Sequence, residues 1–186
     1  YILKPFHGDD MLLHVANALE RRRVMLLSKE YQSDLEKKVE AKDREVRGLE
    51  EELVHRLNST VDSHRDETKA HCERVGLISG VLARHLRWTP ESVERVKLAA
   101  QLHDLGKIGV PDAILLKRGA LTYEEGEILK KHTIIGAQIL DKSQFPLLRL
   151  ARDIALAHHE RWDGGGYPQR LSRKYIPEGA RIVTIA

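Results

Sequence analysis

The sequence predicts an all-α protein in which a long coiled-coil-type linker helix is followed by a helical bundle. Three observations carry this prediction. Residues 28–66 contain no proline and carry dense charge of both signs, as a solvated helix does. Helix-start signals recur later in the chain, because Thr89 precedes Pro90, and Thr122 and Glu125 have the spacing of a capping box. Few segments alternate apolar and polar residues with the period of two that half-buried strands require.

The composition limits the class of protein. Of the 186 residues, 32% are charged, and 31 Lys and Arg nearly balance 28 Asp and Glu. The two signs are interleaved, so the sequence has no basic run of the kind that binds nucleic acid. It also has no apolar stretch near the roughly 20 residues of a membrane helix, and no signal peptide pattern. A single cysteine, Cys72, excludes an internal disulfide. We therefore expect a cytoplasmic protein that binds neither nucleic acid nor membrane.

Residues 1–27 form the first predicted segment. Tyr1–Leu3 is apolar and precedes a turn at Lys4–Pro5, and the acidic pair Asp9–Asp10 offers a start to a helix that we expect to end at Arg21–Arg23. A strand, a Lys-Pro turn and a final helix resemble the C-terminal end of a response-regulator receiver domain. The resemblance implies a two-component response regulator with a sensor kinase as partner. An ordinary strand-to-helix connection is the alternative.

Residues 28–66 form the predicted linker helix. Apolar residues recur there at seven-residue spacing in two alternating registers, which is the a/d seam of a coiled coil. Such a seam predicts a parallel homodimer, because a monomer would expose the apolar stripe to water. A single solvated helix is the alternative, since the seam is short and twice interrupted. The seam consists of Leu35, Val39, Val46, Leu49 and Leu53, with interruptions at Lys42 and Arg56.

Residues 67–186 are richer in apolar residues and contain the candidate site. The chain has ten histidines, and five of them recur with acidic neighbours about one helix and one loop apart. Imidazole and carboxylate groups in this number, in a chain with a single cysteine, disfavour a tetrahedral structural zinc. They suit two or three divalent ions such as iron or manganese. The candidate metal ligands are Glu67, His71, His103, Asp104, His132, His158 and His159.

Two motifs in this part resemble known signatures. His103–Gly109 reads His-Asp-Leu-Gly-Lys-Ile-Gly and resembles the signature of the HD superfamily of metal-dependent phosphohydrolases. His158–Pro168 reads His-His-Glu-Arg-Trp-Asp-Gly-Gly-Gly-Tyr-Pro and resembles the longer signature of the HD-GYP subfamily, and Ile176–Val183 is similar to the next segment of that subfamily. The resemblance implies an HD-superfamily helical bundle. It also implies a phosphodiesterase that opens cyclic di-GMP to pGpG or GMP.

The resemblance implies roles for individual residues. The seven candidate ligands fall on metal positions, and Glu67 falls on the carboxylate associated with a third ion. Lys107 falls on the phosphate-contacting position and forms, with Asp104, the candidate catalytic pair. The glycine-rich loop implies contact with substrate and with partners such as diguanylate cyclases, and a purely structural turn is the alternative. The candidate substrate-binding residues are Lys107, Gly166, Tyr167 and Pro168.

Three functions stay open from the sequence. The first is the cyclic di-GMP phosphodiesterase, working by metal-assisted hydrolysis. The second is a non-catalytic module that binds nucleotide or docks partners through its tyrosine loop. The third is an HD hydrolase of another nucleotide, such as a mixed cyclic dinucleotide or a nucleoside polyphosphate. The family pattern continues after the position of Ala186 with an Asp that bridges the metals, so we expect this chain to be a fragment truncated at its C-terminus.

Overall fold

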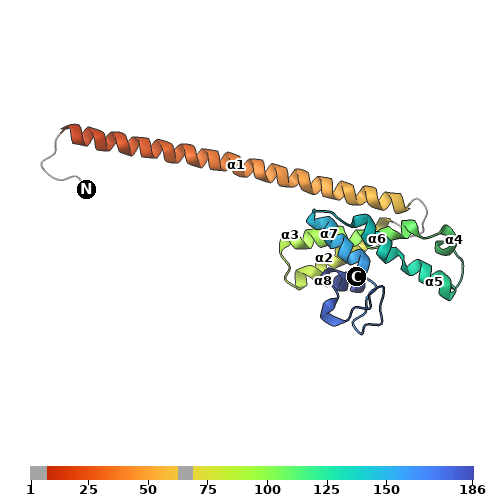
Figure 1. Ribbon diagram of the computed structural model, residues 1–186. Helices are drawn as coiled ribbons and strands as arrows, with labels where there is room; N and C mark the ends of the chain where they lie inside the picture. Colours follow the sequence, from red (N-terminus) through yellow and green to blue (C-terminus); the bar gives the residue numbers. More distant parts are fainter. Residues whose placement is uncertain (1–7, 63–68) are drawn as a thin grey trace. The chain divides into compact units, whose positions relative to one another are not determined.

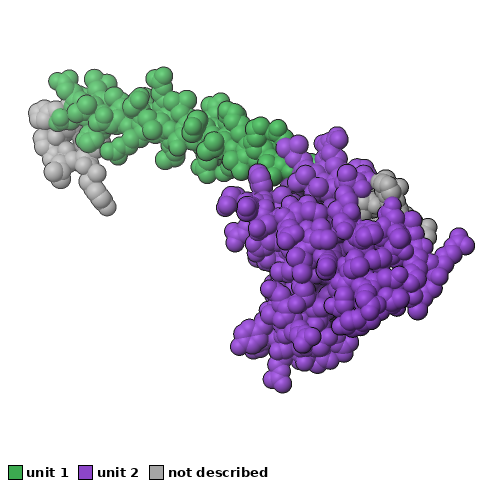
Figure 2. Space-filling model, turned by 45° about the vertical axis from the view of Figure 1, so that its right-hand side comes forward, with its two compact units in different colours: residues 1–48 green, residues 49–186 purple. Residues whose placement is uncertain are grey.

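The computed structural model describes residues 8–62 and 69–186, and all regular elements in these two ranges are helices (Figure 1). This confirms the predicted all-α class. The expected strand and Lys-Pro turn before residue 8 lie outside the described residues, as does the candidate ligand Glu67. No helix within these ranges is both long and apolar enough to cross a membrane. The chain divides into two compact units, residues 1–48 and 49–186 (Figure 2).

The first element, α1 (Gly8–Asp62), is one uninterrupted helix. The expected end of a first helix at Arg21–Arg23 is therefore wrong. The physical reason is that no helix breaker follows, because neither proline nor glycine occurs from residue 9 to Gly48. Opposite charges one turn apart support the exposed helix, as in the pair of Lys38 Nζ and an Asp34 carboxylate oxygen at 2.7 Å.

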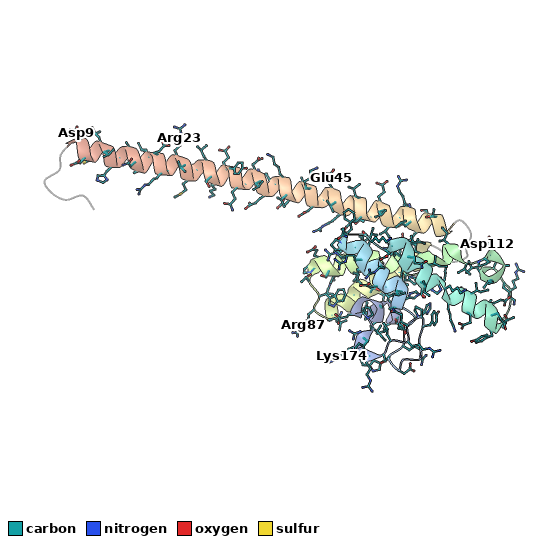
Figure 3. All side chains as sticks on the ribbon, viewed as in Figure 1. Asp9, Arg23, Glu45, Arg87, Asp112 and Lys174 are labelled. Atoms are coloured by element: carbon teal, nitrogen blue, oxygen red, sulfur yellow. The ribbon has the colours of Figure 1, made fainter. Side chains whose placement is uncertain are left out.

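The seam residues that the sequence predicts along α1 are exposed in the single chain. Val39 is 53% exposed and Val46 is 52% exposed. Figure 3 shows the side chains that stand off α1 along its length, from Asp9 past Arg23 to Glu45. The seam residues thus lie on the surface of the single chain, and the coiled coil and the homodimer that would cover them stay predictions.

The core of the second unit begins in the last turns of α1, where Val54 is 1% exposed and packs in the main hydrophobic cluster. The core therefore includes a residue before position 67, where the sequence placed the start of the bundle. Leu102, Leu147 and Ile154 are among its largest fully buried side chains. The surrounding helices are α2 (Lys69–His85), α3 (Pro90–Ala99), α6 (His132–Leu140), α7 (Pro146–Ala157) and α8 (Glu178–Ile185). Helix α7 contacts α3, α6 and α8, and α2 contacts α3 and α8.

Two helix starts agree with the sequence. The Thr89 side chain accepts a hydrogen bond from the backbone N–H of Ser92 at 3.3 Å, and Pro90 opens α3. Thr122 and Glu125 form both bonds of the capping box at the start of α5 (Tyr123–Lys130). The remaining short helices are η1 (Ala100–Leu102), η2 (Leu105–Gly109), α4 (Asp112–Leu115) and η3 (Arg173–Tyr175).

The glycine at position 106 allows two helices of the bundle to meet. A Cβ atom on Gly106 would overlap the carbonyl oxygen of His132 and the amide nitrogen of Gly136, so η2 packs directly on the backbone of α6. A Cβ atom on Gly136 would lie 3.1 Å from the amide nitrogen of Gly106 and 3.3 Å from the Cβ of Ala155 in α7. The close approach at Gly106 therefore fixes the distance between the His103–Gly109 motif and the first turn of α6.

We predict that Gly106→Ala destabilises the bundle by about 1–3 kcal/mol or more, because the added methyl group meets backbone atoms that cannot rotate away. Gly126→Ala is the matched control in α5, where nothing lies within 4 Å of the added carbon. That change should raise stability by about 0.5–1 kcal/mol, because alanine restricts the unfolded chain. Urea unfolding followed by tryptophan fluorescence measures both. Equal stability of the two variants would show that the close approach is not required.

Candidate metal centre

Six of the seven candidate ligands come together in the structure. The ring centroids of His71 and His103 are 5.8 Å apart, and those of His103 and His158 are 5.2 Å apart. The centroids of His132 and His159 are also 5.2 Å apart. The five histidines and Asp104 therefore form one cluster. Glu67, the seventh candidate, lies outside the described residues.

The cluster is built at helix ends. Neighbouring residues of a regular helix point about 100° apart, which would keep His103 and Asp104 from facing one centre. The structure avoids this because the two residues form the turn between η1 and η2, where Asp104 has φ −103° and ψ 10°. His158 caps the C-terminus of α7, and His132 is the first residue of α6, after a break at Lys131. The segment from Thr122 to Leu140 is thus two helices.

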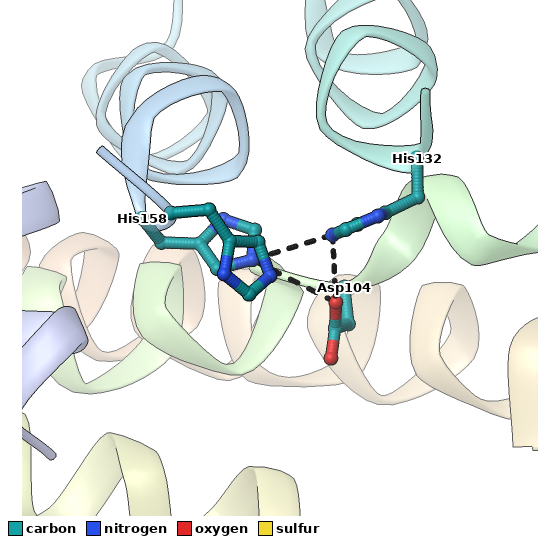
Figure 4. Close-up of side chains that lie close together, drawn as sticks. Asp104, His132 and His158 are labelled. Carbon is teal, nitrogen blue, oxygen red and sulfur yellow. Dashed lines mark hydrogen bonds and ion pairs between the residues drawn. The ribbon is translucent and has the colours of Figure 1, made fainter. Parts of the chain in front are cut away.

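The Asp104 carboxylate points toward the rings of His132 and His158 (Figure 4). Its Oδ2 atom is 2.7 Å from Lys107 Nζ and 3.1 Å from His103 Nε2. Its Oδ1 atom is 3.3 Å from His132 Nε2 and 3.7 Å from His158 Nε2. One carboxylate therefore faces three imidazole nitrogens and one ammonium group.

The backbone fixes which ring nitrogen of these histidines faces Asp104. In three of them Nδ1 lies within hydrogen-bond distance of a carbonyl oxygen, which can only accept, so Nδ1 must carry the proton. A neutral imidazole has one N–H, and its Nε2 lone pair is then free to bind a cation. The bonds are His103 to Ala100 at 2.9 Å, His132 to Leu129 at 2.6 Å, and His158 to Ile154 and Ala155 at 3.1 Å and 3.0 Å.

The ionisation states suit metal ligands. Burial, together with the neighbouring histidines, lowers the pKa of His158 to about 3 and that of His159 to about 4. Burial also lowers the pKa of His132. Burial alone would raise the pKa of Asp104, but its hydrogen bond to His103 and the charge of Lys107 hold that pKa far below the usual range. Burial alone would lower the pKa of His103, but its hydrogen bond to Asp104 and the charge of that carboxylate raise it. At neutral pH the centre therefore combines neutral imidazoles at His132, His158 and His159 with an ionised carboxylate.

These residues fit a divalent cation. Asp104 Oδ1 is buried and has no hydrogen-bond partner, although it faces two Nε2 atoms. The Nε2 atoms of His132 and His158 are 3.4 Å from each other, so their two lone pairs face each other. A cation between them would bind both lone pairs. Ligand atoms of Asp104, His132, His158 and His159 all lie within 4.8 Å of one another. A shared cation would satisfy all of these donors at once.

Glu160 is a buried carboxylate next to the cluster to which the sequence assigned no role. It is 2% exposed, and its carboxylate accepts hydrogen bonds from the backbone N–H groups of Gln169 at 2.7 Å and Leu171 at 2.9 Å. Glu160 therefore anchors the backbone at residues 169–171, directly after the glycine-rich loop. The available signal was its place directly after the histidine pair, but its burial depends on how the loop folds back.

The same loop lies against the cluster. A Cβ atom on Gly166 would overlap the backbone of residues 159–161, so only glycine allows this approach. The N–H of Tyr167 donates to the carbonyl oxygen of His159 at 3.3 Å, and its ring stacks on the His159 ring at 4.7 Å between centroids and 20° between planes. Gly164 has φ 81°, as expected for a glycine turn. The loop thus places Tyr167 at the edge of the metal centre.

Comparison with known proteins assigns this arrangement to a family. Residues 52–186 match the family model described as HD domain. A protein of Thermotoga maritima named cyclic di-GMP phosphodiesterase is 40% identical, over all of this chain and 52% of that protein. One of Xanthomonas campestris named cyclic di-GMP phosphodiesterase response regulator RpfG is 37% identical, over all of this chain and 49% of that protein. The chain therefore spans about half the length of these relatives.

A third relative differs in its named substrate. The Vibrio cholerae protein named 3'3'-cGAMP-specific phosphodiesterase 2 is 43% identical over 143 residues, which cover 76% of this chain and 27% of that protein.

We predict that Asp104→Ala removes most of the bound metal, because the change deletes the only carboxylate among the four grouped ligand candidates. Asp163→Ala is the control, since Asp163 is an exposed carboxylate that pairs with Arg161 at 2.9 Å. Elemental analysis after manganese loading and dialysis measures the metal per chain. Equal metal contents in the two variants would place the ions elsewhere.

Proposed function

Because this chain belongs to the HD domain family, we propose that it is a metal-dependent phosphodiesterase that hydrolyses cyclic di-GMP to pGpG or GMP. The observation that carries the proposal is the buried Asp104 carboxylate, which faces imidazole nitrogens on one side and Lys107 on the other. The names of the relatives from Thermotoga and Xanthomonas support the choice of substrate.

The proposed cofactor is a set of two or three divalent ions, iron or manganese. The mixed nitrogen and oxygen donors support this choice over a structural zinc. When bound, such ions would activate water and neutralise charge on the phosphate. The residues that would hold them are His71, His103, Asp104, His132, His158 and His159, with Glu67 as a further proposed ligand.

The proposed role of Lys107 is electrostatic. Its Nζ is 2.7 Å from Asp104 Oδ2, so the ammonium group is held at the edge of the cluster by a carboxylate. A phosphate at the cluster would accept a hydrogen bond from this group, which would oppose the negative charge that develops in the transition state. Asp104 would position the Lys107 ammonium group and the histidine rings relative to one another. Gly166, Tyr167 and Pro168 would form the adjoining wall of the substrate site.

A second candidate substrate is a mixed cyclic dinucleotide. The observation that favours it is the 43% identity to the Vibrio cholerae protein named for 3'3'-cGAMP. Both candidates carry two phosphodiester groups in one ring, so the reaction at the metal centre would be the same. A non-catalytic docking module is the alternative from another class.

Residues 1–66 are the basis of a regulatory proposal. We propose that residues 1–27 are the C-terminal end of a receiver domain and that residues 28–66 join two copies of a cytoplasmic response regulator, with a sensor kinase and diguanylate cyclases as partners. The relative named as a response regulator aligns with all of this chain. The exposed stripe along α1 supports the homodimer.

We predict that the full-length protein, loaded with iron or manganese, converts cyclic di-GMP to linear product and that Lys107→Met lowers kcat by about 100-fold or more. The variant should keep its metal, because Lys107 is not a ligand. Lys174→Met is the control, since Lys174 is an exposed lysine outside the cluster. Chromatography of the nucleotides and elemental analysis give the two readouts. Metal-loaded protein that binds cyclic di-GMP and never cleaves it would support the docking module.

We also predict that Val39→Asp with Val46→Asp converts a dimer into a monomer, because carboxylates would then face each other across the seam. Lys37→Asp with Arg44→Asp is the control, since these positions lie on the opposite face of the same heptads. Sedimentation velocity at micromolar concentration distinguishes the two states. A monomeric unsubstituted chain would contradict the dimer.

A further inference from the structure

We propose that Arg170 and Lys131, together with Lys130, form a second anion site that binds the phosphate of a cyclic dinucleotide that is not at the metal centre. This inference rests on the proposed function, because it takes a cyclic dinucleotide as the ligand. It names binding residues outside the two sequence motifs.

The site is a groove with a volume of about 680 Å³. Three of its lining side chains are cations, and its one lining carboxylate, Glu127, is already paired with Lys130 at 2.6 Å. The groove is therefore positive even after this pairing. Its lining residues are Tyr123, Glu127, Lys130, Lys131, Ile134, the loop residues 164–168 and Arg170.

The groove and the metal centre share a wall. Tyr167 lines the groove, and its ring stacks on the ring of His159 in the cluster. Lys130 Nζ lies 5.5 Å from the centroid of the same tyrosine ring. Lys131 directly precedes His132, so the break before α6 supplies one cation to the groove and one imidazole to the cluster. The groove and the metal centre are therefore adjacent, as a ligand with two phosphates in one small ring requires.

The backbone at Arg170 is held in an unusual conformation. Arg170 has φ 56°, which costs a non-glycine residue roughly 1–2 kcal/mol. The residues on either side, Gln169 and Leu171, donate their N–H groups to the same buried carboxylate, Glu160. This left-handed turn is thus part of the loop architecture. Three other basic residues, Arg87, Lys142 and Arg173, share the conformation but do not line the groove.

The chemistry of a cyclic dinucleotide requires such a site. It carries two phosphodiester groups, and only one can be attacked at a time. The second keeps its full negative charge and must be paired by cations when it leaves water. The planar fork of an arginine matches two phosphate oxygens, and a lysine adds a compact charge. Tyr123, which is 79% exposed in the same groove, offers a ring on which a base can stack.

The test is the substitution Arg170→Gly. Glycine adopts positive φ without strain, so the loop keeps its bonds to Glu160 while the cation is removed. Arg173→Gly is the matched control, because Arg173 has the same charge and φ 52° but does not line the groove. Isothermal titration calorimetry measures the binding of cyclic di-GMP to the metal-free chain at low ionic strength, where no turnover occurs.

We expect Arg170→Gly to weaken binding about tenfold or more relative to Arg173→Gly, as for loss of a hydrogen bond to a charged group. Lys131→Gln should also weaken the binding of cyclic di-GMP, and it does not change the loop that carries Arg170. Equal affinity in the two glycine variants, or no binding by either, would overturn the inference. A chain that binds through Arg170 but fails to hydrolyse cyclic di-GMP once loaded with metal would keep the inference and reject the phosphodiesterase.

Discussion

The second unit depends on how it accommodates the charge of Asp104. A carboxylate that leaves water needs compensation, and here Lys107 and His103 pair with one oxygen. The other oxygen faces the Nε2 atoms of two histidines whose Nδ1 protons are bound to backbone carbonyls. A cation in the centre would bind this carboxylate oxygen and both Nε2 lone pairs at once. The helix ends around Asp104 bring these groups together.

A second buried carboxylate, Glu160, organises the loop beside the cluster. It uses both oxygens for backbone N–H groups, so its charge is satisfied within the protein and is not available to a metal. The two carboxylates therefore have different roles, and each belongs to one of the two motifs, Asp104 to the first and Glu160 to the second. Asp104 faces the histidine ligand candidates, and Glu160 anchors the segment that carries Tyr167 and Arg170. Through Tyr167 the loop connects the metal centre with the basic groove.

Local signals in the sequence predicted much of the fold. Thr89 and Thr122 act through hydrogen bonds to residues three positions away, so their helix starts are visible in a short window. The five histidines with Asp104 were recognised because several titratable groups of metal-binding type recur in one domain. The family match agrees with the HD-superfamily bundle that the motifs predicted.

Other features depend on distant contacts and could not be predicted from a window. The helix end expected at Arg21–Arg23 was wrong because a cluster of charge does not stop a helix that contains no breaker. Helix α6 begins at His132, without a side-chain cap, and packs against η2 and α7, contacts that a short window does not contain. The burial of Glu160 and the groove at Arg170 both require the loop to fold back on the end of α7.

The most direct test of the metal centre is X-ray absorption at the manganese edge of the loaded chain. Scattering from several imidazole rings is the predicted result, and a shell of oxygen ligands alone would contradict the account.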